Sequence, residues 1–248
     1  MKAVVCVSLV PDSTTKVKID SSGKSIDPNG VSFIINPYDE FAVEEAVKLK
    51  ENNQAETTVI SFGTDASKEA IKKSFQIGID KGILIKSDDE NFDSYTAARN
   101  LADVLKEINP DIILFGKQSI DYDGQYLPIL VGALLNIPAV SIVTSLAING
   151  NEITAEREIE GGKETVSAAM PVIIGAQKGL NNPRYPNLKS IMASKSKPID
   201  VRPQTYKGNY IEVKSMVLPQ GKGKGKIFEG ADSVEEVVKL LKTEAKVF

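Results

Sequence analysis

The sequence predicts an α/β fold built on a mostly parallel, twisted sheet with helices on both faces. Short apolar runs without alternation, such as residues 112–115, are typical of parallel strands covered on both faces. Amphipathic segments separate these runs at regular spacing, which is the pattern of repeated strand–helix–strand units. Extended segments and a polar tail in the second half add an antiparallel hairpin region and a C-terminal arm.

The first half of the chain alternates strands and helices. Polar residues 12–30 contain Ser-Ser-Gly and Pro-Asn-Gly turn signals and predict a loop or an exposed hairpin. The expected strands are a first buried strand over 3–10, ended by Pro11, and further strands over 31–35, 57–62, 82–85 and 112–115. The expected helices begin at Asn36-Pro37, near Asp65 or Ser67, at Ser94 and at Tyr126, and the last two end before Asn109-Pro110 and at Asn136.

The pattern changes in the second half. Asn149-Gly150 lies between two extended segments, which is the strongest short hairpin signal, and Gly161-Gly162 marks a second turn. The extended segments are expected over 140–147, 152–159 and 165–169, followed by a buried apolar strand over 171–175. From Pro198 the chain reads as irregular, with a solvated flexible run over 221–226 and a final amphipathic helix over 233–247. The residues leave open whether this helix packs on its own core or on another subunit.

Composition excludes several classes of function. The 248 residues include no histidine and a single cysteine, Cys6, which lies in an apolar run. This removes histidine-based hydrolysis, most zinc sites and any iron–sulfur site built from this chain alone, so we expect no catalytic residues and no metal. The net charge of −3 argues against a nucleic-acid or membrane-surface binder. The lone cysteine and a first strand that begins at the N-terminus predict a cytoplasmic protein without a leader peptide.

A polar loop between a predicted strand and the following helix is the first candidate binding site. Open parallel sheets bind ligands at the carboxyl ends of their strands, where helix N-termini direct unpaired N–H groups at anions. Backbone amides around Gly124, with Ser119 and Gln125, could cradle a phosphate, while Asp121 and Asp123 would cap the helix or contact ribose. The alternative is that both aspartates are N-caps and Gly124 only relieves the turn.

Two further loops are expected at the same edge of the sheet. They are Asn36-Pro37-Tyr38 and Phe62-Gly63, each of which follows a predicted strand. Tyr38 or Phe62 could flank an adenine ring, and the alternative for either is ordinary packing. The chain has neither a G-x-G-x-x-G motif after its first strand nor a Walker phosphate loop.

Four segments carry a combined signature. They are Asn36–Val47, Gly116–Asp121, Glu156–Glu164 followed by Pro171 and Val172, and Asn182–Leu188 followed by Ile191 and Met192. Taken in this order they resemble the small (beta) subunit of electron-transfer flavoproteins, over nearly the whole chain. The resemblance implies an adenine-nucleotide α-hydrolase-like sheet and a non-catalytic subunit of a heterodimer.

The resemblance also implies a role and a division of the chain. The larger alpha subunit would hold most of the FAD, and electrons would pass from dehydrogenases, such as acyl-CoA dehydrogenases, to an acceptor oxidoreductase. Leu188 matches the family's anchor leucine for dehydrogenase docking, whereas the residues alone suggest a helix-start core position. Glu158 matches a family glutamate near the flavin domain.

The expected division has two parts. An α/β nucleotide-binding domain spans 1–197 and includes the hairpin 140–170 and a recognition loop, 182–195. A C-terminal arm, 198–248, with its terminal helix would pack on the alpha subunit.

A second nucleotide is implied in this subunit, AMP in ordinary members of the family and another FAD in electron-bifurcating members. The positions that match the family's contacts are Cys6, Asn36, Pro37, Tyr38, Asp39, Phe62, Gly116, Lys117, Gln118, Ser119, Ile120, Asp121, Tyr122, Asp123, Gly124, Gln125, Tyr126 and Leu127. The stretch 122–127 departs from both patterns, because Asp123 alone is shared with both and Leu127 replaces a phosphate-binding threonine. We therefore rank AMP first, an empty or altered site second and FAD third.

Two other classes of function stay open. An adenylating enzyme or ATP pyrophosphatase would need a glycine- and serine-rich loop after the first strand, and residues 10–15 do not form one. A monomeric nucleotide sensor would have no need of a long C-terminal arm.

Overall fold

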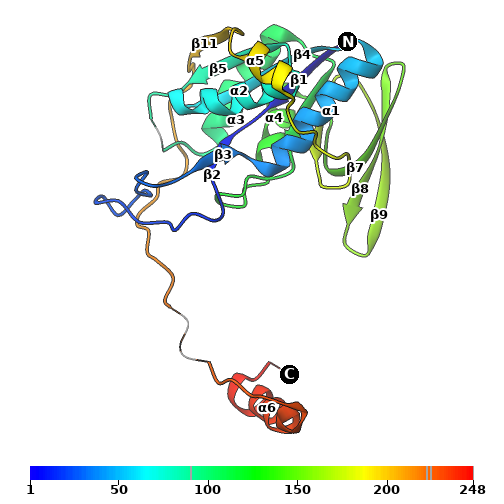
Figure 1. Ribbon diagram of the computed structural model, residues 1–248. Helices are drawn as coiled ribbons and strands as arrows, with labels where there is room; N and C mark the ends of the chain where they lie inside the picture. The colour runs from blue at the N-terminus through cyan, green and yellow to red at the C-terminus, as the bar shows by residue number, and fades with distance from the viewer. Residues whose placement is uncertain (90, 222, 224, 248) are drawn as a thin grey trace.

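The computed structural model describes residues 1–89, 91–221, 223 and 225–247, and its centre is a nine-stranded sheet (Figure 1). The strand order is β11–β5–β4–β1–β6–β10–β7–β8–β9, parallel from β11 to β7 and antiparallel from β7 to β9. The strands are β1 (Lys2–Cys6), β4 (Glu56–Gly63), β5 (Lys81–Lys86), β6 (Ile112–Gly116), β7 (Ala139–Asn149), β8 (Glu152–Ile159), β9 (Gly162–Ala169), β10 (Val172–Ala176) and β11 (Ile199–Pro203). A separate antiparallel pair joins β2 (Leu9–Pro11) to β3 (Phe33–Ile35). The predicted fold class is confirmed.

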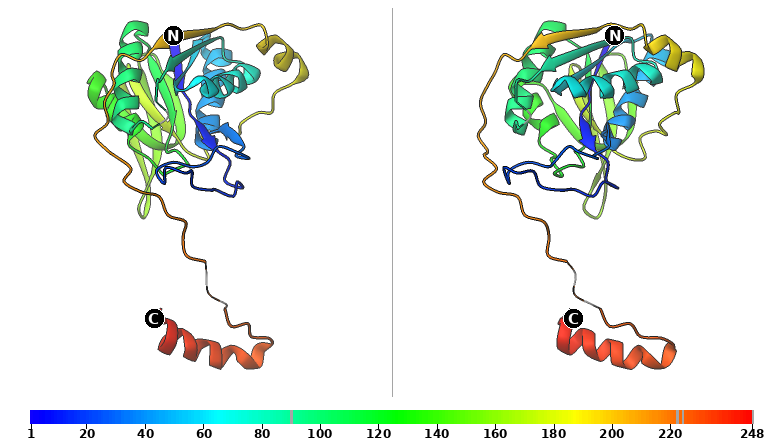
Figure 2. Two further views of the ribbon diagram at one scale, coloured as in Figure 1. Left: turned by 90° about the vertical axis from the view of Figure 1, so that its left-hand side faces the viewer. Right: turned by 60° about the vertical axis from the view of Figure 1, so that its left-hand side comes forward.

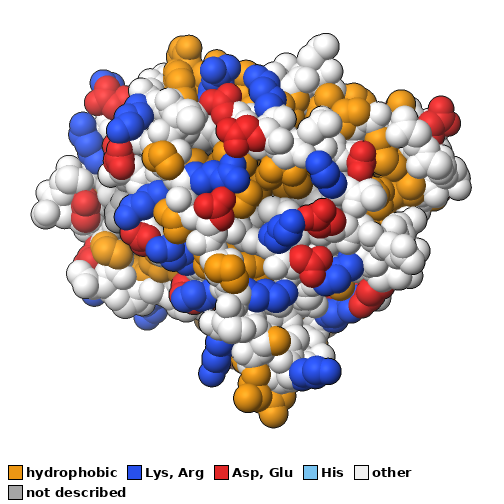
Figure 3. All heavy atoms as spheres, turned by 90° about the horizontal axis from the view of Figure 1, so that it is seen from above, with side chains coloured by type: hydrophobic (Ala, Val, Ile, Leu, Met, Phe, Trp, Pro, Cys, Tyr) orange, Lys and Arg blue, Asp and Glu red, His pale blue; other side chains and the backbone are white. Residues whose placement is uncertain are grey.

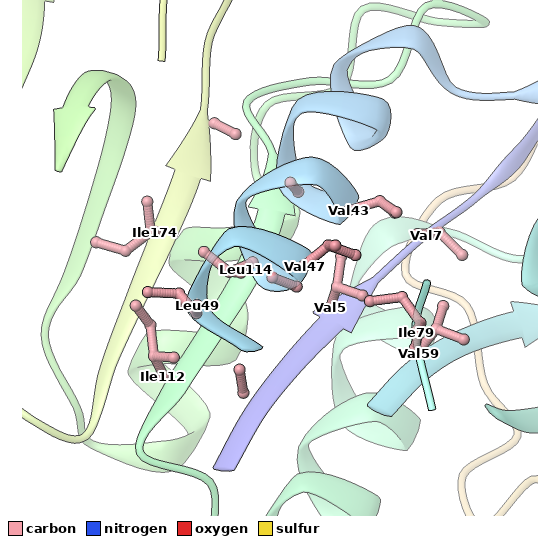
Figure 4. Packing of buried hydrophobic residues seen from close by; sticks show 14 of the residues in the cluster. Val5, Val7, Val43, Val47, Leu49, Val59, Ile79, Ile112, Leu114 and Ile174 are labelled. Carbon is pink, nitrogen blue, oxygen red and sulfur yellow. The ribbon is translucent and has the colours of Figure 1, made fainter. Parts of the chain in front are cut away.

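Helices cover both faces of the sheet. They are α1 (Pro37–Asn53), α2 (Lys68–Ile77), α3 (Ser94–Ile108), α4 (Leu127–Leu135), α5 (Leu188–Ser194) and α6 (Val234–Leu240), with shorter turns η1 (Asp65–Ser67), η2 (Ala231–Ser233) and η3 (Leu241–Ala245). Alternate residues of β1 face opposite layers, as the period of a strand requires. Val5 packs with α1 and α2, and Val4 packs with α3 and α4. Figure 4 shows Val47 of α1 beside Val5 of β1, within the cluster that α1 and α2 form with this face of the sheet.

The prediction of one strand over residues 3–10 is wrong, because the chain bends after Cys6. The N–H of Val7 still donates to the carbonyl of Ile60, over 2.9 Å. Ser8 instead donates both its N–H and its hydroxyl to the Asp39 carboxylate, at 2.8 and 2.9 Å. These two bonds turn the chain out of the main sheet, so the next residues form β2 in the separate pair.

The prediction that the chain is irregular from Pro198 is also wrong, because β11 pairs in parallel with β5 at the edge of the sheet. An edge strand buries little and lacks a long apolar run, so its sequence signal is weak. After β11 the chain is held on α3. The Asn100 side-chain oxygen accepts the N–H groups of Thr205 and Tyr206, at 2.8 and 3.1 Å. Asp93 accepts those of Tyr210 and Ile211, at 2.6 and 3.1 Å.

Beyond Ile211 the arm leaves the body. Two contacts tie it to the loop 12–30: the Met216 N–H donates to the Gly23 carbonyl over 2.7 Å, and the Lys24 ammonium pairs with Glu212 at 3.5 Å. The terminal helix α6 continues into η3, which confirms the predicted final helix, and stands apart from the sheet in all three views (Figures 1 and 2). Lys222 and Lys224 of the predicted flexible run lie outside the described residues. Within the described part of the chain, no helix has the length and apolarity needed to cross a bilayer.

Candidate functional site

The sheet places the predicted loops at its carboxyl edge, beside a topological switch point. From β1 the chain builds β4 and β5 on one side and then crosses to β6 on the other. Open α/β sheets bind ligands at this point, outside the carboxyl ends of the strands. The relevant ends are Cys6 in β1 and Gly116 in β6.

Asp39 joins the segments that meet there. One carboxylate oxygen accepts both donors of Ser8, and the other accepts the Asn36 side-chain amide at 2.9 Å and the Gly116 N–H at 3.1 Å. Asp39 is only 5% exposed and lies in the first turn of α1, where the helix dipole favours negative charge. The four donors occupy the lone pairs of the carboxylate, so Asp39 positions the loops rather than offering a free oxygen to a ligand.

Asn36 fixes the loop that follows β6. Its side-chain oxygen accepts the Ile120 N–H at 3.3 Å, and its amide donates to the Gln118 carbonyl at 2.8 Å. Within the loop, the Ser119 N–H donates to the Gly124 carbonyl at 3.0 Å. The segments 36–39 and 116–124 therefore form one hydrogen-bonded unit, although about eighty residues separate them in the chain.

The aspartates of this loop stabilise turns. Asp121 accepts the hydroxyl of Ser119 and the N–H of Tyr122, and Asp123 accepts the Gln118 side-chain amide at 2.9 Å. Their interpretation as N-caps is wrong, because the N-cap of α4 is Tyr126, which gives no side-chain hydrogen bond. The N-terminus of α4 therefore carries no side-chain cap from that position, and its dipole favours an anion.

The remaining predicted site residues divide into two groups. Lys117 and Tyr38 lie beside the loop, with the ammonium 4.9 Å from the centre of the ring, while Tyr122, Gln125, Tyr126 and Leu127 continue the loop into α4. Cys6 and Phe62 are buried in the sheet, Phe62 edge-on to Phe92 at 4.6 Å. Burial, with a smaller effect of the Asp39 charge, raises the pKa of the Cys6 thiol. Phe62 is the penultimate residue of β4 and lies at the same carboxyl edge, with β1 between its strand and β6, in the same buried cluster as Phe115 of β6.

Two contacts of the site were not predicted. Ser8 binds Asp39, and the Tyr122 hydroxyl lies 3.1 Å from the Ser94 hydroxyl at the start of α3. A serine inside the apolar run at residues 3–10 was the one available signal for the first contact. No local sequence pattern indicated the contact between the Tyr122 and Ser94 hydroxyls.

A cavity of about 540 Å³ lies at the opposite edge of the sheet, between the starts of the strands. Several of its charged side chains pair with one another, as Lys81 does with Glu56 and Arg202 with Glu107. Figure 3 shows charges of both signs interspersed over this face. The cavity is therefore lined by charges of both signs. Among the described residues, no three side chains of His, Cys, Asp or Glu are grouped for a metal.

Leu188 is the first residue of α5, capped by Asn187, whose side-chain oxygen accepts the Ser190 N–H at 2.8 Å. Its side chain is 74% exposed, so the interpretation as a core residue is wrong. Glu158 accepts the Gln177 side-chain amide at 3.0 Å. Because Gln177 follows Ala176, whose carbonyl accepts the Lys117 N–H, this places Glu158 toward the same edge as the loop.

The buried carboxyl of Asp39 predicts a pH dependence of stability. Burial raises its pKa from 3.8 to about 6, although the bonds from Ser8, Asn36 and Gly116 oppose the rise. The folded chain thus binds more protons than the unfolded chain between pH 4 and 6, so this group makes the free energy of unfolding fall as pH rises, by roughly 3 kcal/mol in all. In Asp39→Asn, the free energy of unfolding should no longer fall over this pH range. It should also be lower than that of the natural chain, because the substitution leaves buried donors unpaired. Urea unfolding at several pH values measures both, and a constant difference from the natural chain would contradict the prediction.

An open, mostly parallel sheet whose switch-point loop leads into a helix N-terminus is the architecture of nucleotide-binding α/β proteins. Residues 24–206 match the family model described as the electron transfer flavoprotein domain. The chain is 36% identical over 226 residues to electron transfer flavoprotein subunit beta of Syntrophomonas wolfei, with 91% of this chain and 88% of the relative covered. The chain therefore belongs to the electron transfer flavoprotein family, among its beta subunits.

Other relatives agree. The Bacillus subtilis subunit beta is 35% identical over 265 residues, with 100% of each chain covered. The Mus musculus subunit beta is 33% identical over 205 residues, with 81% of this chain and 80% of the relative covered. Flavin-based electron transport is thus the class of function in which the site is to be interpreted.

Proposed function

We propose that this chain is the beta subunit of a heterodimer that carries electrons from dehydrogenases, such as acyl-CoA dehydrogenases, to an acceptor oxidoreductase, through FAD held mainly by an alpha subunit. The observation that carries the proposal is the exposed C-terminal arm, whose described residues are 212–221, 223 and 225–247. It exposes Val217, Leu218 and Ile227, and none of the described residues of α6 is buried. Apolar residues at positions 234, 237, 238 and 241 recur at helical spacing on one face.

Such a surface is typical of an interface, because unpartnered apolar area favours burial against another chain. The arm is suited to wrap the alpha subunit, while the body keeps its own core between the two helix layers. Glu158, at the carboxyl edge, is proposed to face the flavin domain. The cytoplasmic location stays a prediction from the single cysteine.

For the second nucleotide we propose AMP at the loop 116–124. The helix dipole at the start of α4 supports a phosphate there, and Lys117 adds a positive charge beside Tyr38. Leu127 would offer a phosphate only its backbone N–H. The ligand would have a structural role in holding this loop, because the segments 36–39 and 116–124 are joined there by hydrogen bonds.

The proposal is tested by expressing the chain alone and together with its alpha subunit. We expect no flavin absorbance from the chain alone and one tightly bound FAD in the co-purified complex. A compact monomer that binds nucleotide, stays colourless and captures no alpha subunit would instead support the sensor hypothesis.

Leu188→Ala should weaken docking of the partner dehydrogenase without loss of FAD. A single apolar anchor at the centre of a small interface contributes about 2 kcal/mol or more, so we expect a roughly tenfold or greater rise in KM for the flavoprotein. Steady-state reduction by an acyl-CoA dehydrogenase measures this. Ile159→Ala, at another exposed apolar position, is the matched control. Loss of FAD in Leu188→Ala would show that Leu188 is a packing residue.

A further inference from the structure

The recognition loop is fixed to helix α1 by an arginine that bridges two glutamates. The Arg184 guanidinium donates to Glu44 through Nε at 2.9 Å and Nη2 at 2.8 Å, and to Glu51 through Nη1 at 2.6 Å. The Arg184 backbone N–H adds a bond to Glu44 at 3.1 Å. The two carboxylates hold the pKa of Arg184 above its ordinary value, so its charge is permanent.

The glutamates on α1 are unusual because two consecutive ones are buried. Glu44 is 5% exposed and Glu45 is 4% exposed. Asn181 donates to Glu45 at 2.9 Å and to the Phe41 carbonyl at 2.9 Å, just before the recognition loop begins. Burying a carboxylate is unfavourable unless it is paired and hydrogen-bonded, and residues of the loop and its approach supply much of that pairing. Only arginine offers the planar fork that can bind both Glu44 and Glu51 at once.

The other end of the loop is also fixed. The Lys197 ammonium donates to the Ile79 carbonyl at 2.6 Å and lies 5.3 Å from the centre of the Phe75 ring. Helix α5 lies beside α2 between these two attachments (Figures 1 and 2). Both ends of the recognition loop are therefore attached to the body of the protein.

The recognition loop exposes three large apolar side chains. Tyr185 is 95% exposed, Leu188 74% and Met192 65%. Leu188 and Met192 are four residues apart in α5, so they lie on one face of the helix. An ordered presentation of such side chains lowers the entropy cost of docking.

We propose that Arg184 is a positioning residue for partner docking, which acts by tying the recognition loop to α1 so that Tyr185, Leu188 and Met192 form a preformed apolar patch. This inference rests on the proposed docking function of the loop. Arg184 itself need not touch the partner, because its guanidinium is engaged by Glu44 and Glu51.

The test uses the heterodimer and compares a double variant at Arg184 and Glu44 with two controls, Glu51→Gln and Leu188→Ala. Arg184→Met alone leaves Glu44 buried and unpaired, so Arg184→Met combined with Glu44→Gln is the variant that keeps the body folded. Glu51→Gln removes only the exposed partner and is the matched control. Leu188→Ala leaves the attachment intact.

The first readout is hydrogen–deuterium exchange of the backbone amides of 185–194. The double variant should exchange about tenfold faster or more there, Glu51→Gln should change exchange much less, and Leu188→Ala should not change it. The second readout is reduction by an acyl-CoA dehydrogenase, where the double variant should raise KM about tenfold with kcat unchanged.

The outcomes separate the inference from the proposed function. Unchanged exchange in the double variant overturns the inference. The inference is also overturned if the double variant exchanges faster but keeps its KM, while Leu188→Ala raises KM. Faster exchange with an unchanged KM in both variants shows that the loop is held as described but does not dock this donor, which overturns the docking function and the positioning role with it.

Discussion

Gly116→Ala should detach the nucleotide loop from helix α1 and abolish binding of the second nucleotide. A Cβ at this position would lie 2.4 Å from Asp39 Oδ1, 2.7 Å from the Tyr38 carbonyl carbon and 2.8 Å from the Asp39 nitrogen. Two of these atoms belong to the backbone, and the third belongs to a carboxylate held by four donors, so none can yield freely. The methyl group would also displace the N–H that Gly116 donates to Asp39.

We expect Gly116→Ala to lower the free energy of unfolding by roughly 2–4 kcal/mol, from overpacking and the broken buried hydrogen bond. Urea unfolding measures the stability, and nucleotide release from the denatured complex measures the occupancy. Gly162→Ala is the matched control, because a Cβ there meets nothing within 4 Å. Unchanged stability and nucleotide content in Gly116→Ala would show that the Asp39 contacts do not hold the site.

Ending the chain at Ile211 should prevent assembly with the alpha subunit while the body stays folded. The hydrogen bonds of the segment 205–211 to α3 stay intact, and both core clusters lie before the cut. The exposed C-terminal arm carries the apolar residues proposed to bind the partner, so removing it should weaken association by about a thousandfold or more. Co-purification yield and FAD content measure the loss, and thermal unfolding of the shortened chain checks the body.

A point substitution refines this test. Val238→Asp places a charge on the apolar face of α6 and should weaken assembly, whereas Glu235→Gln leaves that face unchanged and should not. A chain ending at Ile211 that still captures the alpha subunit with a full complement of FAD would show that the interface lies elsewhere.

The sequence was sufficient for elements whose boundaries are set locally. Helix α3 begins and ends where predicted because Asp93 accepts the Thr96 N–H at 2.8 Å and Asn109 ends the helix in a left-handed conformation before Pro110. The end of β1 was mispredicted because the Ser8–Asp39 bonds, between residues far apart in sequence, override the apolar run. The edge strand β11 was missed because it buries too little to have a sequence signal.

The same contrast holds for the site. The expectation that loops at 36 and 116 meet at one edge followed from topology and is confirmed by the Asn36 and Asp39 bonds. Phe62 also lies at this edge, in the same buried cluster as Phe115 of β6, and its role beside an adenine ring stays a prediction. The attachment of Arg184 to α1 could not be predicted, since Glu44 alone is indistinguishable from a solvated helix residue and its partner lies 140 residues away.

The most direct test of the central claim is to co-purify this chain with its alpha subunit, denature the complex, and identify and count the released nucleotides. One FAD and one AMP per heterodimer is the result we predict for one-flavin electron transfer with a structural nucleotide at the loop 116–124. Two FAD per heterodimer would contradict this account and would make the protein a candidate for electron bifurcation, with the second flavin in this subunit.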